Sequence, residues 1–112
     1  MNLFIVDLSS RKVEKTSISK RDLSLFIGGR GVCSLLLYRM VKPGIPSFSR
    51  DNPLIIGVGA LTGLLYPAAS RCVFSSKSPL TNGLGYSCVG GFFGAKLRQA
   101  GANYLVLKGA SS

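Results

Sequence analysis

The sequence predicts an α+β fold in which short β-strands are combined with two or three helices. Three observations support this fold class. The chain has 112 residues, enough for one small domain. Hydrophobic residues make up 46% of it, which is too many for a disordered chain. The apolar runs switch between the alternation typical of strands and the spacing typical of helices, and glycine or proline separates them.

The first part of the chain predicts a β-hairpin followed by a helix. Residues 3–7 and 13–18 are expected to form two strands joined by a serine-containing turn. Ser19 can cap the helix that follows, because Asp22 stands three residues later, as in a capping box. Apolar residues spaced three or four apart continue this helix to position 27.

Three glycines within residues 28–31 predict a break in the helix, because an interior glycine costs about 1 kcal/mol relative to alanine. A second helix is expected over residues 33–40. The Pro-Gly pair that follows ends this helix, and residues 43–53 predict a loop.

The second part of the chain predicts three more strands and a helix. A buried strand is expected at 54–57, then a glycine-spaced turn at 57–63, a helix at 92–100 and a last strand at 104–107. Residues 71–77 alternate between apolar and polar, which predicts a half-buried strand with a basic outer face. That outer face consists of Arg71, Ser75 and Lys77.

A glycine pair before the last helix indicates an anion-binding site. Gly90 and Gly91 leave backbone N–H groups open at the start of a helix, where anions bind well. Arg71 and Lys77 are expected to supply cations from the neighbouring strand. The alternative is that the glycines serve only helix–sheet packing and that Arg71 is an ordinary surface cation. The spacing alone does not decide between the two interpretations.

The turn at 57–63 does not match a dinucleotide-binding fingerprint. Its last glycine comes one position late for the pattern G-x-G-x-x-G, and a proline follows where a helix is needed. We therefore interpret this segment as a tight turn.

The composition argues against an independent catalytic or metal site. The chain has no histidine and only four acidic residues. Cys33, Cys72 and Cys88 are far apart and form no C-x-x-C pair, so they cannot alone supply the four ligands of a zinc or iron–sulfur site. The sequence shows no signal peptide and no membrane-spanning run, which predicts a cytoplasmic protein without a membrane partner.

The net charge of +10 leaves one alternative function open, a basic module that binds nucleic acid or another polyanion. The cations are scattered, and the chain contains no known reading motif or aromatic stacking platform. These features favour a solvated basic surface and argue against nucleic acid as a partner.

Four stretches of the chain resemble, in order and spacing, the amino-terminal domain of the tungsten-dependent aldehyde:ferredoxin oxidoreductase family. They read FIGGRG at 26–31, GVGALTG at 57–63, RCVFSSKSPLT at 71–81 and GGFFG at 90–94. The resemblance covers residues 1–112 as a single, incomplete cofactor-binding domain, about half of the family's amino-terminal domain.

The resemblance implies a function in aldehyde oxidation to carboxylic acids, with ferredoxin as electron acceptor. It implies a tungstopterin (or molybdopterin) cofactor and a [4Fe–4S] cluster, for which this chain has no ligands. Arg71 matches a family arginine that contacts cofactor phosphate. The cofactor-contacting turn of the family corresponds to Cys88, Val89, Gly90 and Gly91.

Two departures from the family pattern affect this expectation. Cys88 stands where the family usually has asparagine, and Val89 where it has alanine. A thiol does not replace an amide, which both donates and accepts hydrogen bonds. A buried Cys88, or a structural subunit that has lost its cofactor, is therefore an alternative. The cluster cysteines and acid–base residues belong to later segments of the family, so we expect the isolated chain to be inactive.

The low charged fraction suggests that apolar surface needs a partner. Charged residues make up 16% of the chain, and a small domain buries only about 60% of its unfolded surface. We therefore expect a homodimer, or a separate chain that supplies the missing half.

Overall fold

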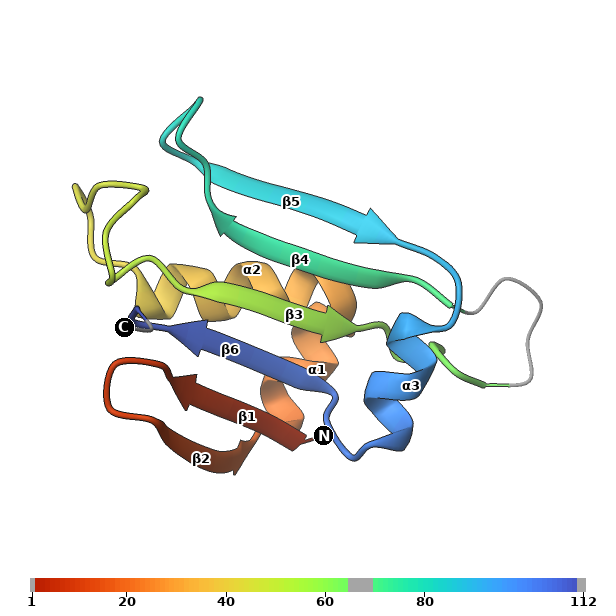
Figure 1. Cartoon of the computed structure of the whole chain (residues 1–112). Helices are drawn as coiled ribbons and strands as arrows, with labels where there is room; N and C mark the ends of the chain where they lie inside the picture. Colours follow the sequence, from red (N-terminus) through yellow and green to blue (C-terminus); the bar gives the residue numbers. More distant parts are fainter. Residues whose placement is uncertain (1, 65–69, 111–112) are drawn as a thin grey trace.

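The structure, a computed structural model, describes residues 2–64 and 70–110 and is built on one mixed six-stranded sheet. The strands lie in the order β2-β1-β6-β3-β4-β5 (Figure 1). Their bounds are β1 Asn2–Asp7, β2 Lys12–Ser17, β3 Leu54–Val58, β4 Cys72–Lys77, β5 Leu84–Val89 and β6 Tyr104–Lys108. Together with three helices, this sheet confirms the predicted α+β fold.

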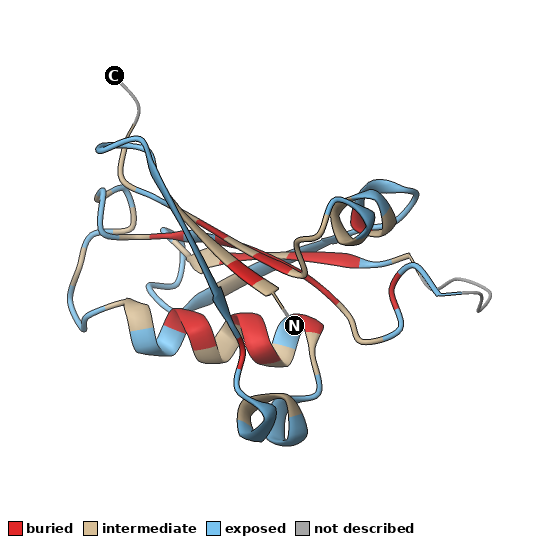
Figure 2. Cartoon of the chain, turned by 90° about the horizontal axis from the view of Figure 1, so that it is seen from below, coloured by how far each residue is buried: buried red, intermediate tan, exposed pale blue. Residues whose placement is uncertain are grey.

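The helices lie on both faces of the sheet. Helices α1 (Lys20–Phe26) and α2 (Gly29–Met40) lie on one face, and α3 (Phe93–Gln99) lies on the other at one end of the strands (Figures 1 and 2). The main core lies between α2 and the sheet. Its buried members include Val32, Cys33, Leu36, Leu37, Ile55, Tyr104 and Val106. A smaller cluster under α3 contains Ile56, Val58 and Cys72.

The strand pairing joins segments from the two ends of the sequence. β1 pairs with β2 in an antiparallel hairpin and with β6 in parallel, whereas β3 pairs antiparallel with both β6 and β4. Contacts beyond the ladder reinforce this junction, because the N–H of Asn2 donates to Oδ1 of Asn103 at 3.1 Å. β6 is thus the strand that links the hairpin to the rest of the sheet.

The predicted hairpin, helix cap and helix break are confirmed. The N–H of Asp22 donates to Oγ of Ser19 at 3.1 Å, and α1 begins at the next residue after that serine. However, α2 begins at Gly29 and not at residue 33. The glycines open the second helix because a Cβ at Gly31 would collide with the backbone oxygen of Phe26, so only glycine lets the two helices meet so closely.

The prediction of a basic outer face on β4 is wrong. The side of β4 that carries Val73 and Ser75 is covered by α2, and Ser75 is only 1% exposed. Lys77 is half-buried, and its ammonium donates to the backbone oxygen of Ile45. Alternation correctly indicated a strand but could not show that a helix covers the polar side. β5, which no sequence pattern had indicated, pairs with β4 along its whole length.

Within the described residues, no single helix is long and apolar enough to cross a bilayer, although the sharply bent pair α1–α2 meets the criteria jointly.

Candidate anion-binding site at one end of the sheet

The predicted site residues gather at the end of the sheet where β3 and β5 finish and β4 begins, which we call the site end (right-hand side of Figure 1). The register pairs Cys72 with Val89 and Val73 with Cys88. Arg71 directly precedes Cys72, and Gly90 directly follows Val89, so the two are neighbours beyond the ladder. The sheet therefore brings together the arginine and the glycine pair that the sequence singled out.

The turn at 57–63 holds the backbone of Arg71 in place. The Thr62 hydroxyl accepts a hydrogen bond from the N–H of Gly59 at 2.9 Å and donates to the backbone oxygen of Arg71 at 2.8 Å. Thr62 is buried, whereas Arg71 is exposed. This confirms the tight turn, and it gives the turn a role: it fixes the start of β4 while the guanidinium of Arg71 stays free to reach solvent.

The glycines at the site end have two different environments. A Cβ placed on Gly90 or Gly91 would have no heavy atom of the described residues within 4 Å, and Gly91 has a φ of +77°. A Cβ on Gly94 would instead lie 3.0 Å from Cγ2 of Thr62 and 3.2 Å from Cβ of Cys72. Gly94 thus serves helix packing, but the packing explanation does not apply to the glycine pair. The pair leaves open backbone that another molecule could approach.

Cys88 and Val89 lie in the last two positions of β5, where both are exposed. The alternative of a buried Cys88 is therefore wrong. Cys88 shares a strand face with Tyr86, because successive residues of a strand point to opposite sides. All three cysteines are free thiols, and burial raises the pKa of Cys33 to about 12 and that of Cys72 above its ordinary value.

Lys77 does not belong to this site, contrary to the prediction. It is the last residue of β4 and pairs with Leu84 at the opposite end of the strand, which we call the far end. The far end also holds Asp7, Asp51 and Lys108. The prediction is wrong because two residues on one face of a strand need not lie close together. Arg71 and Lys77 are separated by the length of β4.

A second exposed arginine lies on the helix side of the site end. Arg30, in the first turn of α2, donates from Nη1 to the Tyr86 hydroxyl at 2.9 Å, and its guanidinium carbon lies 5.0 Å from the ring centroid. The sequence analysis singles out the FIGGRG stretch for its helix break and for the family resemblance, and assigns no role to Arg30. No local signal connects Arg30 with Tyr86, which lies on a different element.

Tyr104, the first residue of β6, holds the start of α2 in place. The side chain is fully buried, and its hydroxyl accepts a hydrogen bond from the N–H of Gly29 at 3.2 Å. Burial raises the pKa of the phenol to about 12, although this hydrogen bond acts in the opposite direction. The neutral phenol thus positions the helix turn that carries Arg30.

The four carboxylates are used elsewhere in the structure. Asp22 forms a two-pronged ion pair with Arg39, and the hydrogen bond from Arg39 lowers the pKa of that carboxyl. Glu14 lies in β2 opposite Ile5, and Asp7 and Asp51 lie at the far end. In residues 2–64 and 70–110, no three His, Cys, Asp or Glu side chains gather in a way that could hold a metal ion. The site end therefore presents the exposed cations Arg71 and Arg30 without a carboxylate bonded to either.

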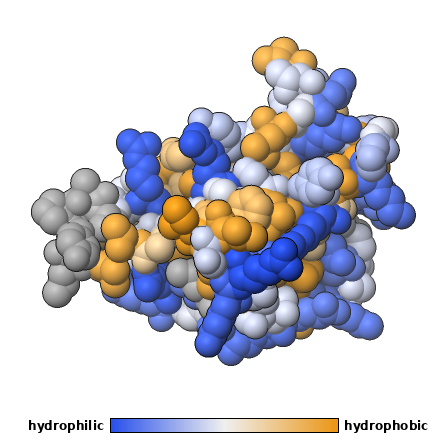
Figure 3. All heavy atoms as spheres, turned by 180° about the vertical axis from the view of Figure 1, so that it is seen from behind, coloured by the Kyte–Doolittle hydropathy of each residue, from blue (hydrophilic) through white to orange (hydrophobic). Residues whose placement is uncertain are grey.

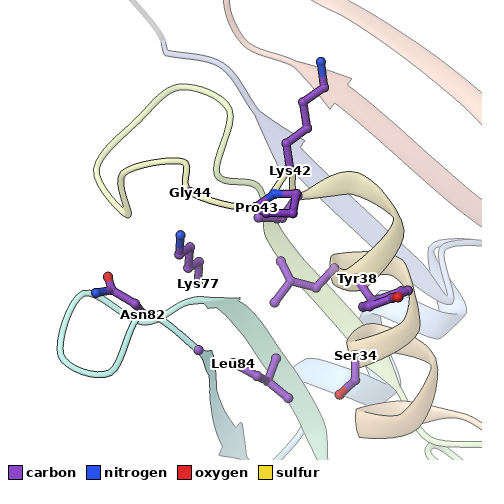
Figure 4. A pocket seen from close by; sticks show the side chains of 11 residues that line it. Ser34, Tyr38, Lys42, Pro43, Gly44, Lys77, Asn82 and Leu84 are labelled. Carbon is purple, nitrogen blue, oxygen red and sulfur yellow. The ribbon is translucent and has the colours of Figure 1, made fainter.

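A large hollow lies away from this surface, between α2 and the β4–β5 hairpin (Figure 4). It has a volume of about 710 Å³, and Tyr38, Lys77 and Leu84 are among the side chains that line it. The ammonium of Lys77 is already bonded to Ile45. The hollow is open and mostly apolar, and of the residues predicted for the anion site only Lys77 lines it.

Comparison with known proteins gives one consistent result. The family model described as "Aldehyde ferredoxin oxidoreductase, N-terminal domain" matches residues 3–112. The chain is 34% identical over 104 residues to the tungsten-containing aldehyde ferredoxin oxidoreductase of Pyrococcus furiosus. It is 32% identical over 110 residues to the WOR-like subunit of an aliphatic sulfonate oxidoreductase from the same organism.

The match covers most of this chain but little of each relative. The alignment with the first of these proteins includes 93% of this chain and 17% of the relative. Among solved structures, a chain of the active site complex BamBC of benzoyl coenzyme A reductase matches with a TM-score of 0.95 and 32% identity. There too the coverage is 98% of this chain and 17% of the other.

Proposed function

Because the chain belongs to the aldehyde ferredoxin oxidoreductase family, in the part that matches its N-terminal domain, we propose that it holds a tungstopterin cofactor at the site end of its sheet. The observation that carries this proposal is the juxtaposition of exposed Arg71 with the open backbone of Gly90 and Gly91. A cation that can hold phosphate bidentately lies next to backbone that an anion can approach closely.

The residues present fit such a group. The site end is free of the four carboxylates, which would repel phosphate, and no side chain of residues 2–64 or 70–110 blocks the glycine pair. In this proposal Arg71 binds a cofactor phosphate, and Gly90 and Gly91 contact it through their backbone. Cys88 and Val89 line the approach along β5. When bound, the cofactor supplies the redox chemistry, and the chain supplies binding and orientation.

We further propose that the chain does not oxidise aldehydes on its own. It spans about 17% of the length of the curated relatives it matches. Its three cysteines do not gather into a cluster site: Cys33 and Cys72 are buried, and Cys88 is exposed. A [4Fe–4S] cluster and ferredoxin contacts would come from other segments or chains. Aldehyde-dependent reduction of ferredoxin or viologen by the purified chain would contradict this part of the proposal.

The test of cofactor binding is retention of tungsten and pterin by protein purified anaerobically from its own host. Arg71→Ala should lose most of the retained cofactor, measured by elemental analysis and by fluorescence of the released pterin. Arg50→Ala is the matched control, because Arg50 is an exposed arginine before β3 at the far end. Equal cofactor content in Arg71→Ala and in the unmodified chain would contradict cofactor binding by Arg71. It would favour the alternative of a structural subunit that has lost its cofactor.

We propose that the partner is a second copy of this chain or a separate chain that supplies the missing segments. The exposed apolar side chains support this proposal: Leu25 and Ile27, around the end of α1, are 63% and 72% exposed. Figure 3 views this side and shows apolar atoms gathered on it. A cytoplasmic location fits the three free thiols. Light scattering that gives a clean monomer of 11.8 kDa would exclude the homodimer.

A further inference from the structure

We propose that Arg30 is a second cation of the same site, held in position by Tyr86 to bind a phosphate group of the anionic cofactor. The inference rests on the proposed function, and it adds a residue pair that neither the family resemblance nor the glycine motifs had assigned. The supporting observation is that the guanidinium of Arg30 is oriented by a neutral partner and is not neutralised by a carboxylate.

A comparison with Arg39, on the same helix, shows why this matters. Arg39 donates two hydrogen bonds to the carboxylate of Asp22, at 2.7 and 3.1 Å, so its charge is already compensated. Arg30 gives one N–H to the Tyr86 hydroxyl and lies against its ring. A guanidinium has five N–H donors, so most of its hydrogen-bonding capacity and all of its charge are left for an anion.

The position of Arg30 places this charge beside the proposed cofactor site. Its partner Tyr86 and Cys88 lie on the same face of β5, and Gly90 follows at the same interval. From Tyr86 to Gly90 the strand advances about 13 Å, at roughly 3.3 Å per residue. Arg71 lies beside Gly90 at one end of this row, and Arg30 is held at the other. The two arginines thus flank Cys88 along β5.

Such an arrangement suits a ligand with two separated or linked phosphate groups better than a single small anion. The ring of Tyr86 limits where the guanidinium can lie, so less side-chain freedom is lost when an anion binds. Tyr86 is therefore a positioning residue in this proposal, and Arg30 is the residue that touches the ligand.

The test uses pyrophosphate as a probe, titrated calorimetrically into the full chain at fixed salt. Arg30→Gln should weaken binding about 10- to 100-fold, as expected for loss of charge-assisted hydrogen bonds. Arg30→Lys should restore only part of the affinity, because lysine lacks the planar fork. Tyr86→Phe should weaken binding several-fold without changing the thermal midpoint. Arg50→Gln removes an equal charge at the far end and should change the affinity less than twofold.

The outcomes separate this inference from the proposed function. If Arg71→Gln weakens binding but Arg30→Gln does not, the role of Arg30 is wrong and the cofactor site stands. If the unmodified chain does not bind pyrophosphate, or all variants bind it equally, both proposals fail. Tungsten and pterin retained by Arg30→Gln from the native host give a second readout, and full retention would also overturn the role of Arg30.

Discussion

The two ends of the sheet differ in the partners of their charged side chains and in the space around their glycines. At the far end, Asp7 lies opposite Lys108, and its carboxylate accepts a hydrogen bond from the N–H of Ser9 at 3.0 Å. At the site end, Arg71 and Arg30 are exposed, and neither has a carboxylate among its hydrogen-bond partners. The far end therefore holds carboxylates among its cations, whereas the exposed arginines of the site end have none bonded to them.

Two glycines, one at each end, also differ in their surroundings. Gly109, at the far end, has a φ of +78°, and a Cβ there would lie 2.5 Å from Oγ of Ser9 and 2.9 Å from Oδ1 of Asp7. Gly90, at the site end, has empty space around it. The fold therefore requires glycine at position 109, whereas it leaves room for a side chain at position 90. The contrast shows that counting glycines does not reveal their purpose, whereas the space around each one does.

The largest effect should come from exchanging these two glycines for alanine in turn. Gly109→Ala should reduce the free energy of unfolding by about 2–4 kcal/mol, through backbone strain and overpacking. Gly90→Ala should change it by less than about 0.5 kcal/mol, yet reduce the retained cofactor. Urea denaturation measures both stabilities. A large loss with Gly90→Ala would break the comparison between the two ends.

A smaller effect is expected from removal of the Tyr104 hydroxyl, which holds the start of α2 at the site end. Tyr104→Phe removes the acceptor of the Gly29 N–H and should cost about 1–2 kcal/mol, measured by urea denaturation at pH 7. The matched control is Tyr38→Phe. Tyr38 lies on α2 and is largely exposed, so removing its hydroxyl should leave the free energy of unfolding almost unchanged.

The same tyrosine predicts a loss of stability in alkali. Burial raises its pKa in the folded chain to about 12, above the ordinary value of 10.0. Its contribution is therefore complete below pH 10 and is lost as the pH rises from 10 towards 12. The pKa of Cys33 is also raised to about 12, so the decline should begin near pH 9. Above pH 10, the free energy of unfolding of Tyr104→Phe, measured by urea denaturation, should fall less steeply with pH than that of the unmodified chain. An identical slope would contradict this.

The smallest effect concerns acid and the far end. Partial desolvation raises the pKa of Asp7, but hydrogen bonds from Ser10 and Ser9 outweigh it, and the net pKa is lowered below 3.8. The resulting stabilisation is present above about pH 4 and is lost as the pH falls through the folded value. Asp7→Asn should flatten the acid limb of the stability profile slightly, as thermal scans between pH 2 and 6 can show.

Elements set by local chemistry could be predicted from the sequence. The hairpin and the Ser19 cap depend on neighbouring residues, and both appear as expected. The two faces of β4 could not be assigned, because the covering helix comes from another part of the chain. β5 contains glycine and serine among its six residues, which weakens a strand signal.

The same limit applies to the site. Arg71 and the glycine pair could be singled out by residue type, and the register of β4 and β5 brings them together. The assignment of Lys77 to the site is wrong. Alternation shows which face of a strand a side chain occupies but not which end, and Arg71 and Lys77 lie at opposite ends of β4. Arg30 and Tyr86 could not be connected, since only the packing of α2 against the sheet makes them neighbours.

The place of β6 in the sheet has a consequence for how the protein is made. β6 lies between β1 and β3 and joins two otherwise separate groups of strands, although it follows both groups in the sequence. While the nascent chain leaves the ribosome, β1 and β2 can form their hairpin, and β3, β4 and β5 can pair with each other. Neither group can complete the shared core until Tyr104 and Val106 have emerged. The apolar edges of β1 and β3 stay open during that interval, so chaperones that bind exposed strands should associate with the growing chain until β6 has emerged.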